Sequence, residues 1–387
     1  MFVGPLVLLA ALLQLPATEI ETLKGDRQAG ELVELNDTAA LLKQGDKTVS
    51  VPMTSVLEVK FPATVPVEPA ISPRIVLADG SRITAGAFSV AGEKVRCESS
   101  FGTLTFPVPR LSSVRFGEST SRLDDAWKGL LARESTSDLL IVRNEDVLDF
   151  LAGVSGDVGE KVHVLLDGDD VPVAREKVYG IIYHRRVPSL PKNVCQVKLA
   201  GGDVLEAAQI SFGAGAARVR LAAGVDAIVP QAQLVAIDFS PSKIKYLSDL
   251  KPRDVKYVPF WEIFLYEYRR DRSLDGAAIM LKGKNYPRGL AMHSKTTLRF
   301  RIAGEYTRFL AIAGIDDSVA QLGHAVQLTI TGDGKPLLDA EIKGREAPRP
   351  LDLDVTGVRD LEIVCDFGSD ISDIGDHLDL ADAKLVK

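Results

Sequence analysis

The sequence predicts an all-β protein, in which an array of small β-barrel-like repeats precedes a β-sandwich. From residue 18 onward, short runs of Val, Ile, Leu and Phe alternate with polar residues, and glycine and aspartate interrupt these runs. Alternation of this kind is typical of half-buried strands. A ten-residue motif also recurs before residue 240, and a single stretch shows the periodicity of a helix.

The recurring motif opens with proline and closes on an apolar–polar–Phe triplet. Its copies are PMTSVLEVKF (52–61), PVPRLSSVRF (107–116) and PQAQLVAIDF (230–239), with a looser copy, PVAREKVYGIIY, at 172–183. Upstream, IVLADGSRITA (75–85) and VKLAGGDVLEA (197–207) have the pattern of strand, tight glycine turn and strand. A period of this length predicts small β modules, here residues 19–61, 75–117, 138–186 and 194–240. Their order of strands and turns resembles that of an Sm-like β-barrel.

A helical connector is expected over residues 118–137. Within RLDDAWKGLLARE (122–134), Leu123, Trp127 and Leu130 fall on one face of a helix. Ser121 is the expected N-cap, and Trp127 is expected to anchor the helix on a neighbouring module. Proline-rich stretches at 61–74 and 185–194 predict extended linkers. The last boundary is expected in SPSKIKYLSDLKP, at 240–252.

The N-terminus carries an uncharged apolar run from Phe2 to Leu15. It is shorter than the roughly 20 residues that a spanning helix needs, and it has the length of a signal-peptide core. We therefore expect a signal peptide at residues 1–17 and an exported protein, in the periplasm, the cell envelope or the extracellular space. A buried first strand or helix is the alternative. No later stretch is long and apolar enough to span a membrane, so we expect no membrane span in the mature chain.

Composition excludes some classes of partner. The formal net charge is −7 and the pI about 5.4, which argues against a nucleic acid partner, because phosphate binding needs a basic face. The three cysteines, Cys97, Cys195 and Cys365, lie far apart in strand-like stretches and are expected to be buried thiols. They form neither a CxxC pair nor a Cys/His cluster with metal-ligand spacing.

The stretch from Tyr246 to Lys387 carries the most distinctive motifs, which include YRRDRSLDG, LKGKNYPRGLAMHS, FLAIAGIDD, VQLTITGDGKPLLDA and DIGDHLDLADAKL. In their order along about 140 residues they resemble the NPCBM family of carbohydrate-binding modules, named after family 98 glycoside hydrolases. The resemblance implies a jelly-roll β-sandwich with the galactose-binding-like fold, and a module that binds sugars without catalysis. Strand patterns such as LRFRIAG and LEIVCDF, divided by glycine and aspartate turns, agree with a sandwich.

The resemblance makes several polar residues candidates for hydrogen bonds to sugar hydroxyls. His293 follows GLAM at the expected end of a strand, and a core histidine bonded to backbone is its alternative role. Asp316 and Asp317 close the strand in GIDD and could hold a turn instead. Asp376 and His377, in GDH, open an acidic end segment whose oxygens would suit calcium, although no EF-hand spacing is present. We expect no obligatory cofactor, with calcium as the alternative.

Further candidates are an arginine-rich turn and two aromatic residues. Arg269 and Asp271, in YRRDRS, could clamp a hydroxyl or form a salt-bridged turn. Leu380 stands where the family motif carries a tryptophan, so Trp261 and Tyr286 are the expected aromatic platforms.

No catalytic motif accompanies these residues. GVSGD (153–157) lacks the spacing of a nucleophile elbow, and none of the five histidines forms an HExxH. The sequence thus predicts a non-enzymatic, exported glycan- or polysaccharide-binding protein. Two alternatives remain: a cell-envelope scaffold that contacts envelope proteins and binds no sugar, and a targeting adjunct to a catalytic chain.

Overall fold

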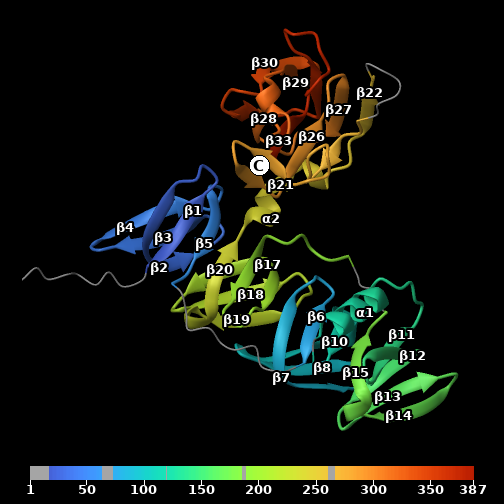
Figure 1. Cartoon of the computed structure of the whole chain (residues 1–387). Helices are drawn as coiled ribbons and strands as arrows, with labels where there is room; N and C mark the ends of the chain where they lie inside the picture. Colours follow the sequence, from blue (N-terminus) through green and yellow to red (C-terminus); the bar gives the residue numbers. More distant parts are fainter. Residues whose placement is uncertain (1–16, 63–72, 119, 185–188, 260–265) are drawn as a thin grey trace, which may run out of the picture. The chain divides into compact units, whose positions relative to one another are not determined.

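The computed structural model describes residues 17–62, 73–118, 120–184, 189–259 and 266–387. They divide into two compact units, residues 1–242 and 243–387, shown in Figure 1. Both are built of antiparallel strands, as the all-β prediction requires. The expected signal peptide, most of the linker at 61–74 and the start of that at 185–194 lie outside the described residues. Within the described residues, no helix has the length and apolarity needed to cross a membrane.

The N-terminal unit consists of four modules of five strands each. Module 1 contains β1 (Thr18–Thr22), β2 (Arg27–Leu35), β3 (Ala39–Gln44), β4 (Lys47–Pro52) and β5 (Val56–Lys60). Module 2 contains β6 (Arg74–Leu77), β7 (Arg82–Ala91), β8 (Lys94–Ser99), β9 (Gly102–Pro107) and β10 (Leu111–Arg115). Module 3 contains β11 (Asp138–Asn144), β12 (Val147–Val158), β13 (Lys161–Leu166), β14 (Asp169–Ala174) and β15 (Val178–Ile182). Module 4 contains β16 (Cys195–Leu199), β17 (Val204–Gly213), β18 (Ala216–Leu221), β19 (Asp226–Pro230) and β20 (Leu234–Asp238).

All four modules share one pattern of strand pairing. The first strand pairs with the second and the fifth, the second with the third, and the third with the fourth. The proline motif of the sequence forms the fifth strand of each module and the turn before it. In modules 2, 3 and 4 a 3₁₀ turn precedes the fifth strand, at Val108–Arg110, Arg175–Lys177 and Gln231–Gln233. Alternate residues of the strands, such as Ile20, Ile75 and Val197, fill the core.

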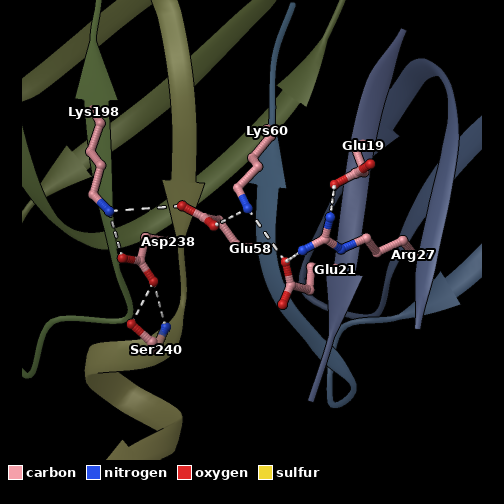
Figure 2. Close-up of polar contacts among 8 residues, drawn as sticks. All are labelled: Glu19, Glu21, Arg27, Glu58, Lys60, Lys198, Asp238 and Ser240. Carbon is pink, nitrogen blue, oxygen red and sulfur yellow. Dashed lines mark hydrogen bonds and ion pairs between the residues drawn. The ribbon is translucent and has the colours of Figure 1, made fainter. Parts of the chain in front are cut away.

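The modules join through their fifth strands, in two nested pairs. β5 pairs with β20, and β10 pairs with β15. The first module in sequence is therefore paired with the last, and the two middle modules are paired with each other. Each fifth strand has a partner on both sides, so none remains an open edge. At the junction of modules 1 and 4 the outward residues form a chain of ion pairs, shown in Figure 2. Lys60 lies 3.3 Å from Glu21 and 3.1 Å from Glu58, and Lys198 lies 2.8 Å from Asp238.

Modules 2 and 4 also meet, through the two near-identical hairpins at 75–85 and 197–207. The Ser81 hydroxyl oxygen accepts from the Glu206 amide (2.9 Å), and the Asp203 carboxylate accepts from the Thr84 amide (2.9 Å). Ser81 and Asp203 occupy equivalent positions in the two hairpins, as do Thr84 and Glu206. The contact is therefore reciprocal. Burial raises the pKa of Asp203, and the bond from Thr84 opposes the rise.

Helix α1 (Ser121–Leu131) packs on module 3, and its Asp124 pairs with Arg115 of module 2. The expected N-cap is wrong: Ser121 is the first helical residue, and the Thr120 side chain accepts from the Leu123 amide. Trp127 is buried as predicted, and its ring packs edge-on to Tyr179 at 5.9 Å. Gly180 makes the approach possible, because a Cβ there would lie 2.7 Å from the Trp127 ring.

The C-terminal unit is a β-sandwich. It begins at Lys243, the last residue of helix α2 (Ser240–Lys243), and so slightly before the boundary expected at Tyr246, because β21 pairs with the last strand. One sheet has the order β23-β26-β33-β28-β31 with β21 on β33, the other has β22-β27-β32-β29-β30, and β24 and β25 form a hairpin. Two 3₁₀ turns, Leu247–Asp249 and Ala320–Leu322, lie among the strands. The strands are β21 (Ile244–Tyr246), β22 (Asp254–Tyr257), β23 (Arg269–Arg270), β24 (Ile279–Leu281), β25 (Lys284–Tyr286), β26 (Gly289–Met292), β27 (Thr296–Arg301), β28 (Arg308–Ile315), β29 (Ala325–Gly332), β30 (Lys335–Lys343), β31 (Arg349–Asp354), β32 (Asp360–Phe367) and β33 (Leu378–Val386).

Side chains of both sheets form the core of the sandwich, among them Phe300, Phe309 and Cys365. Cys97, Cys195 and Cys365 are all buried free thiols, as predicted. Leu380 is also fully buried in this core. Leu380, at the position where the motif predicted an aromatic residue, is therefore a core residue of the sandwich.

Candidate functional site

Three strand ends meet at one edge of the first sheet of the C-terminal unit. β26 ends just before His293, β28 ends just before Asp316, and β33 begins just after His377. In the register of the sheet, Leu378 is the strand partner of Met292 on one side and of Ile315 on the other. The backbone amide of Asp316 donates to the His377 carbonyl at 3.0 Å. Antiparallel pairing thus brings together three residues that lie far apart in the sequence.

An aromatic group forms around the two histidines. The Tyr266 ring stacks on His293, with ring centroids 4.2 Å apart and an interplanar angle of 9°. The His377 ring lies 5.9 Å from His293 and 5.7 Å from Tyr266. Tyr257 completes the group, edge-on to His293 at 6.4 Å. The histidines are almost fully buried, and the tyrosines are half-buried. We call Tyr257, Tyr266, His293 and His377, with Asp316, Asp376 and Asp379, the strand-end group.

Burial keeps both histidines neutral. Burial, and then the neighbouring His377, lowers the pKa of His293 to about 4. Burial also lowers the pKa of His377, although Asp275 opposes the shift. A neutral imidazole offers one donor and one acceptor. Among the described residues, the His377 Nδ1 atom is buried without a hydrogen-bond partner, because the nearest carboxylate oxygen, on Asp275, is 3.9 Å away.

Two carboxyls of the group are buried in unusual protonation states. Burial raises the pKa of Asp376 to about 7, with Asp370 and Asp373 adding to the rise and Ser294 opposing it. Burial and the adjacent Asp316 raise the pKa of Asp379 well above its usual value. Burial alone would raise the pKa of Asp316, but hydrogen bonds from Asp379 and Ser318 outweigh it and lower that pKa. Asp379 therefore keeps its proton to a higher pH than an ordinary aspartate and is hydrogen-bonded to Asp316.

The two carboxyl oxygens of Asp376 are buried, and neither has a hydrogen-bond partner within the described part of the chain. Asp379, by contrast, is hydrogen-bonded to Asp316. Buried polar groups in folded proteins are almost always paired, so unpaired ones call for an explanation such as a ligand. Here they lie beside neutral imidazoles and tyrosine rings. The set offers donors, acceptors and a ring face to an uncharged polar molecule.

A hollow of about 580 Å³ lies next to Tyr266 and is lined by Tyr266, Glu267, Tyr268, Arg269 and Leu274. Tyr266 is the member of the strand-end group that lines it. Arg269 is exposed, and its strand β23 pairs with β26, the strand that leads into His293.

Of the residues predicted from sequence, the structure brings His293, Asp316, Asp376 and His377 together. Other predicted residues make structural contacts. Asp317 accepts from the Lys282 and Gly283 amides (2.7 Å each) and closes the β24–β25 turn. Asp271 accepts from the Gly289 amide (3.0 Å) and lies 3.3 Å from Arg288. These contacts correspond to the turn alternatives that the sequence left open.

The predicted aromatic platforms differ from the aromatic residues found in the group. Tyr286 is buried in a cluster with Ile279 and Leu281, and Trp261 lies outside the described residues. Sequence reasoning missed Tyr257 and Tyr266, which carry no motif and reach His293 only through the fold. In the described ranges, no group of three or more His, Cys, Asp or Glu side chains has the arrangement needed to hold a metal ion.

Comparison with known proteins finds a family model that matches the C-terminal unit. The family model of the NPCBM/NEW2 domain matches residues 243–386, which confirms the resemblance predicted for residues 246–387. A Renibacterium salmoninarum protein, provisionally named an endo-alpha-N-acetylgalactosaminidase, is 30% identical over 90 residues. That match covers 23% of this chain and 6% of the relative, so the chain spans a small part of that protein.

Solved structures with similarity to this chain include carbohydrate-binding modules of family 51. One, from Clostridium perfringens GH95 in complex with methyl-galactose, is 23% identical, covers 37% of this chain and 99% of its own, and has a TM-score of 0.34. Another, the CBM51-2 and INT domains of Clostridium perfringens ZmpB, is 24% identical, covers 38% of this chain and 32% of its own, and has a TM-score of 0.34.

Proposed function

We propose that the C-terminal unit binds a neutral carbohydrate reversibly at the strand-end group. The observation that carries the proposal is the set of buried, unpaired polar atoms on Asp376 and His377 beside the Tyr266 ring. Sugar hydroxyls both donate and accept, so they can satisfy neutral imidazoles and carboxyls together. An aromatic ring can cover the apolar face of a pyranose. The match to the NPCBM/NEW2 domain supports the same function.

Part of the proposal is that no reaction takes place at this site. A glycosidase needs two carboxyls about 5–9.5 Å apart, on either side of the bond to be cleaved. Asp316 and Asp379 are instead hydrogen-bonded to each other. The Asp316 oxygens also accept from the backbone amides of Ser318 (3.0 Å) and Met280 (3.3 Å). We further propose that the protein is exported, on the strength of its apolar N-terminal run.

Envelope-protein contact is a second candidate function. Its supporting observation is an exposed cross-strand pair on module 3, Val154 opposite Leu165, which are 53% and 47% exposed. Two side chains form a small surface compared with the core of a specific protein interface. The strand-end group therefore supports sugar binding better than module 3 supports a protein partner.

The test is a glycan array probed with the full chain and with Tyr266→Ala, each with and without EDTA. We expect selective binding of neutral glycans, unchanged by EDTA and weakened by about tenfold or more in the variant. His163→Ala is the control, because His163 lies in module 3 with Asp170 at 2.9 Å. A well-folded protein that binds no glycan would overturn sugar binding, and loss of binding in EDTA would show that a metal such as calcium is required.

A further inference from the structure

The outer face of module 2 carries an unusual arrangement of like charges. Arg74, at the start of β6, lies directly opposite Arg115 on β10. Like charges in directly opposed positions destabilise a sheet. The equivalent pair is Glu19 opposite Lys60 in module 1, and Gln196 opposite Asp238 in module 4. Module 2 is thus the exception among modules with the same strand order.

One substitution in the recurring motif accounts for the difference. In module 1 the motif places Glu58 two residues before Lys60, and Glu58 lies 3.1 Å from Lys60 and 3.8 Å from Lys198 (Figure 2). In module 2 the corresponding residue is Ser113, two residues before Arg115. The carboxylate that joins the cations at one junction is therefore a hydroxyl at the other.

Helix α1 supplies a single acid in compensation. The Asp124 carboxylate accepts from Arg115 at 2.5 Å, and the Arg115 side chain is 10% exposed. Arg74 and Arg82 are exposed and form no ion pair or hydrogen bond among the described residues. Arg82 shares the outer face because it lies opposite Val76 on β6. Among these three guanidinium groups, Arg115 thus pairs with Asp124, and Arg82 is attracted by the carboxyl of Glu206, in a protein whose net charge is negative.

These arginines surround a cavity. A hollow of about 460 Å³ lies over this face, within the range of roughly 300–1,000 Å³ usual for small-molecule sites. Arg74, Arg82 and Arg115 line it together with the Trp127 ring from α1 and the Gly201–Asp203 turn of module 4. Asp203 points its carboxylate at the Thr84 amide, and burial raises its pKa. The hollow therefore combines a positive floor with an aromatic wall.

We propose that this hollow binds the oxyanion of a small organic acid, of the size and shape of an acidic monosaccharide such as a uronic acid. A guanidinium group matches a carboxylate with two parallel hydrogen bonds. Arg74 and Arg82 are the two groups free to do so, and Arg115 adds positive potential from below. The Trp127 ring provides a flat apolar wall for the body of the ligand. This site is distinct from the strand-end group and does not depend on it.

The experiment is calorimetric titration of the full chain with galacturonate, galactose, sulfate and inorganic phosphate. We expect galacturonate to bind with an affinity that falls as salt rises. Arg74→Gln and Arg82→Gln should each weaken this binding by about tenfold. Arg96→Gln, which changes an exposed arginine on β8 of the same module beside Glu98, should leave it unchanged.

Ser113→Glu is the decisive variant, because it places in module 2 the carboxylate that Glu58 provides in module 1. It should abolish galacturonate binding. Because Ser113 is 2% exposed, a melting curve of the variant must show that it is folded before the loss is assigned to the new carboxylate. Galacturonate binding that survives Ser113→Glu or both glutamine variants would overturn the proposal. So would equally tight binding of sulfate or phosphate, or binding lost in His377→Ala, which would place the acid in the C-terminal unit.

Discussion

The junction of modules 1 and 4 and the strand-end group differ in how their polar side chains are paired. At the junction, Lys60 and Lys198 each lie within 4 Å of two carboxylates (Figure 2). In the strand-end group, Asp376 is fully buried with unpaired oxygens. Leaving a buried polar atom unpaired costs about 1–3 kcal/mol. The ion pairs of the junction therefore stabilise the fold. The unpaired polar atoms of the strand-end group destabilise it, and a bound ligand could pair with them.

The largest expected effect is a loss of stability from a core substitution that leaves glycan affinity unchanged. Leu380→Ala should destabilise the C-terminal unit by about 2–5 kcal/mol, because it empties a fully buried position of the core. The protein should still bind its glycan at temperatures where it is folded, since Leu380 packs between the sheets and away from the strand-end group. Denaturant unfolding and glycan titration of the same sample measure the two effects. Loss of affinity in a folded Leu380→Ala protein would place this residue in the site.

The next effect is a pH dependence. Because the folded-state pKa of Asp376 is about 7 and its usual value is 3.8, the folded state holds a proton that the unfolded state has lost between these values. Asp376 therefore stabilises the fold most at low pH, and this contribution falls as pH rises toward 7. Asp376→Asn should remove it, so the variant should gain stability relative to wild type from pH 4 to 7, by at most about 4 kcal/mol.

His293 is expected to shift stability in the opposite direction over nearly the same range. Its pKa is lowered from 6.5 to about 4, so the unfolded state binds the extra proton, and stability falls as pH drops through this window. His293→Gln should flatten this acid-side loss. Hydrogen exchange of peptides covering β26 and β33 at several pH values would measure both variants. Parallel pH profiles for wild type and Asp376→Asn would contradict the assigned pKa.

A smaller effect tests the reciprocal contact of modules 2 and 4. Asp203→Ala should leave the Thr84 amide unpaired and destabilise the N-terminal unit by about 1–2 kcal/mol. Asp203→Ser should recover part of the loss, because Ser81 performs the same task at the equivalent position. Calorimetric melting of the three proteins is the measurement. Equal melting temperatures for wild type and Asp203→Ala would show that the contact contributes nothing.

The smallest effect concerns the ion pairs of the junction. Lys198→Met should cost less than about 1 kcal/mol, since partly exposed ion pairs contribute little. The half-buried Asp238 would lose its cation, yet Ser240 would still donate to it at 2.6 Å. Glycan affinity should not change. A loss of several kcal/mol would mean that the junction stabilises the N-terminal unit far more than an ordinary ion-pair network.

Sequence reasoning reached the all-β class, the strand patterns and the family of the C-terminal unit, because these depend on local alternation and on motifs. It could not reach the nested joining of the modules. β5 and β20 pair across more than 170 residues, and nothing in either strand alone specifies its partner. It also placed the site only in part. His293 and His377 stood in motifs, whereas Tyr266 joins them through the fold, and the buried Leu380 could not be told from a surface residue by its position in a motif.

The most direct test of sugar binding at the strand-end group is calorimetric titration of the best array glycan into wild type, His377→Ala and His163→Ala. We expect His377→Ala to lose affinity by tenfold or more, about 1.4 kcal/mol, because its buried Nδ1 is one of the unpaired atoms a hydroxyl would satisfy. His163→Ala should bind like wild type. Equal affinity of all three proteins would contradict the account and place the sugar elsewhere.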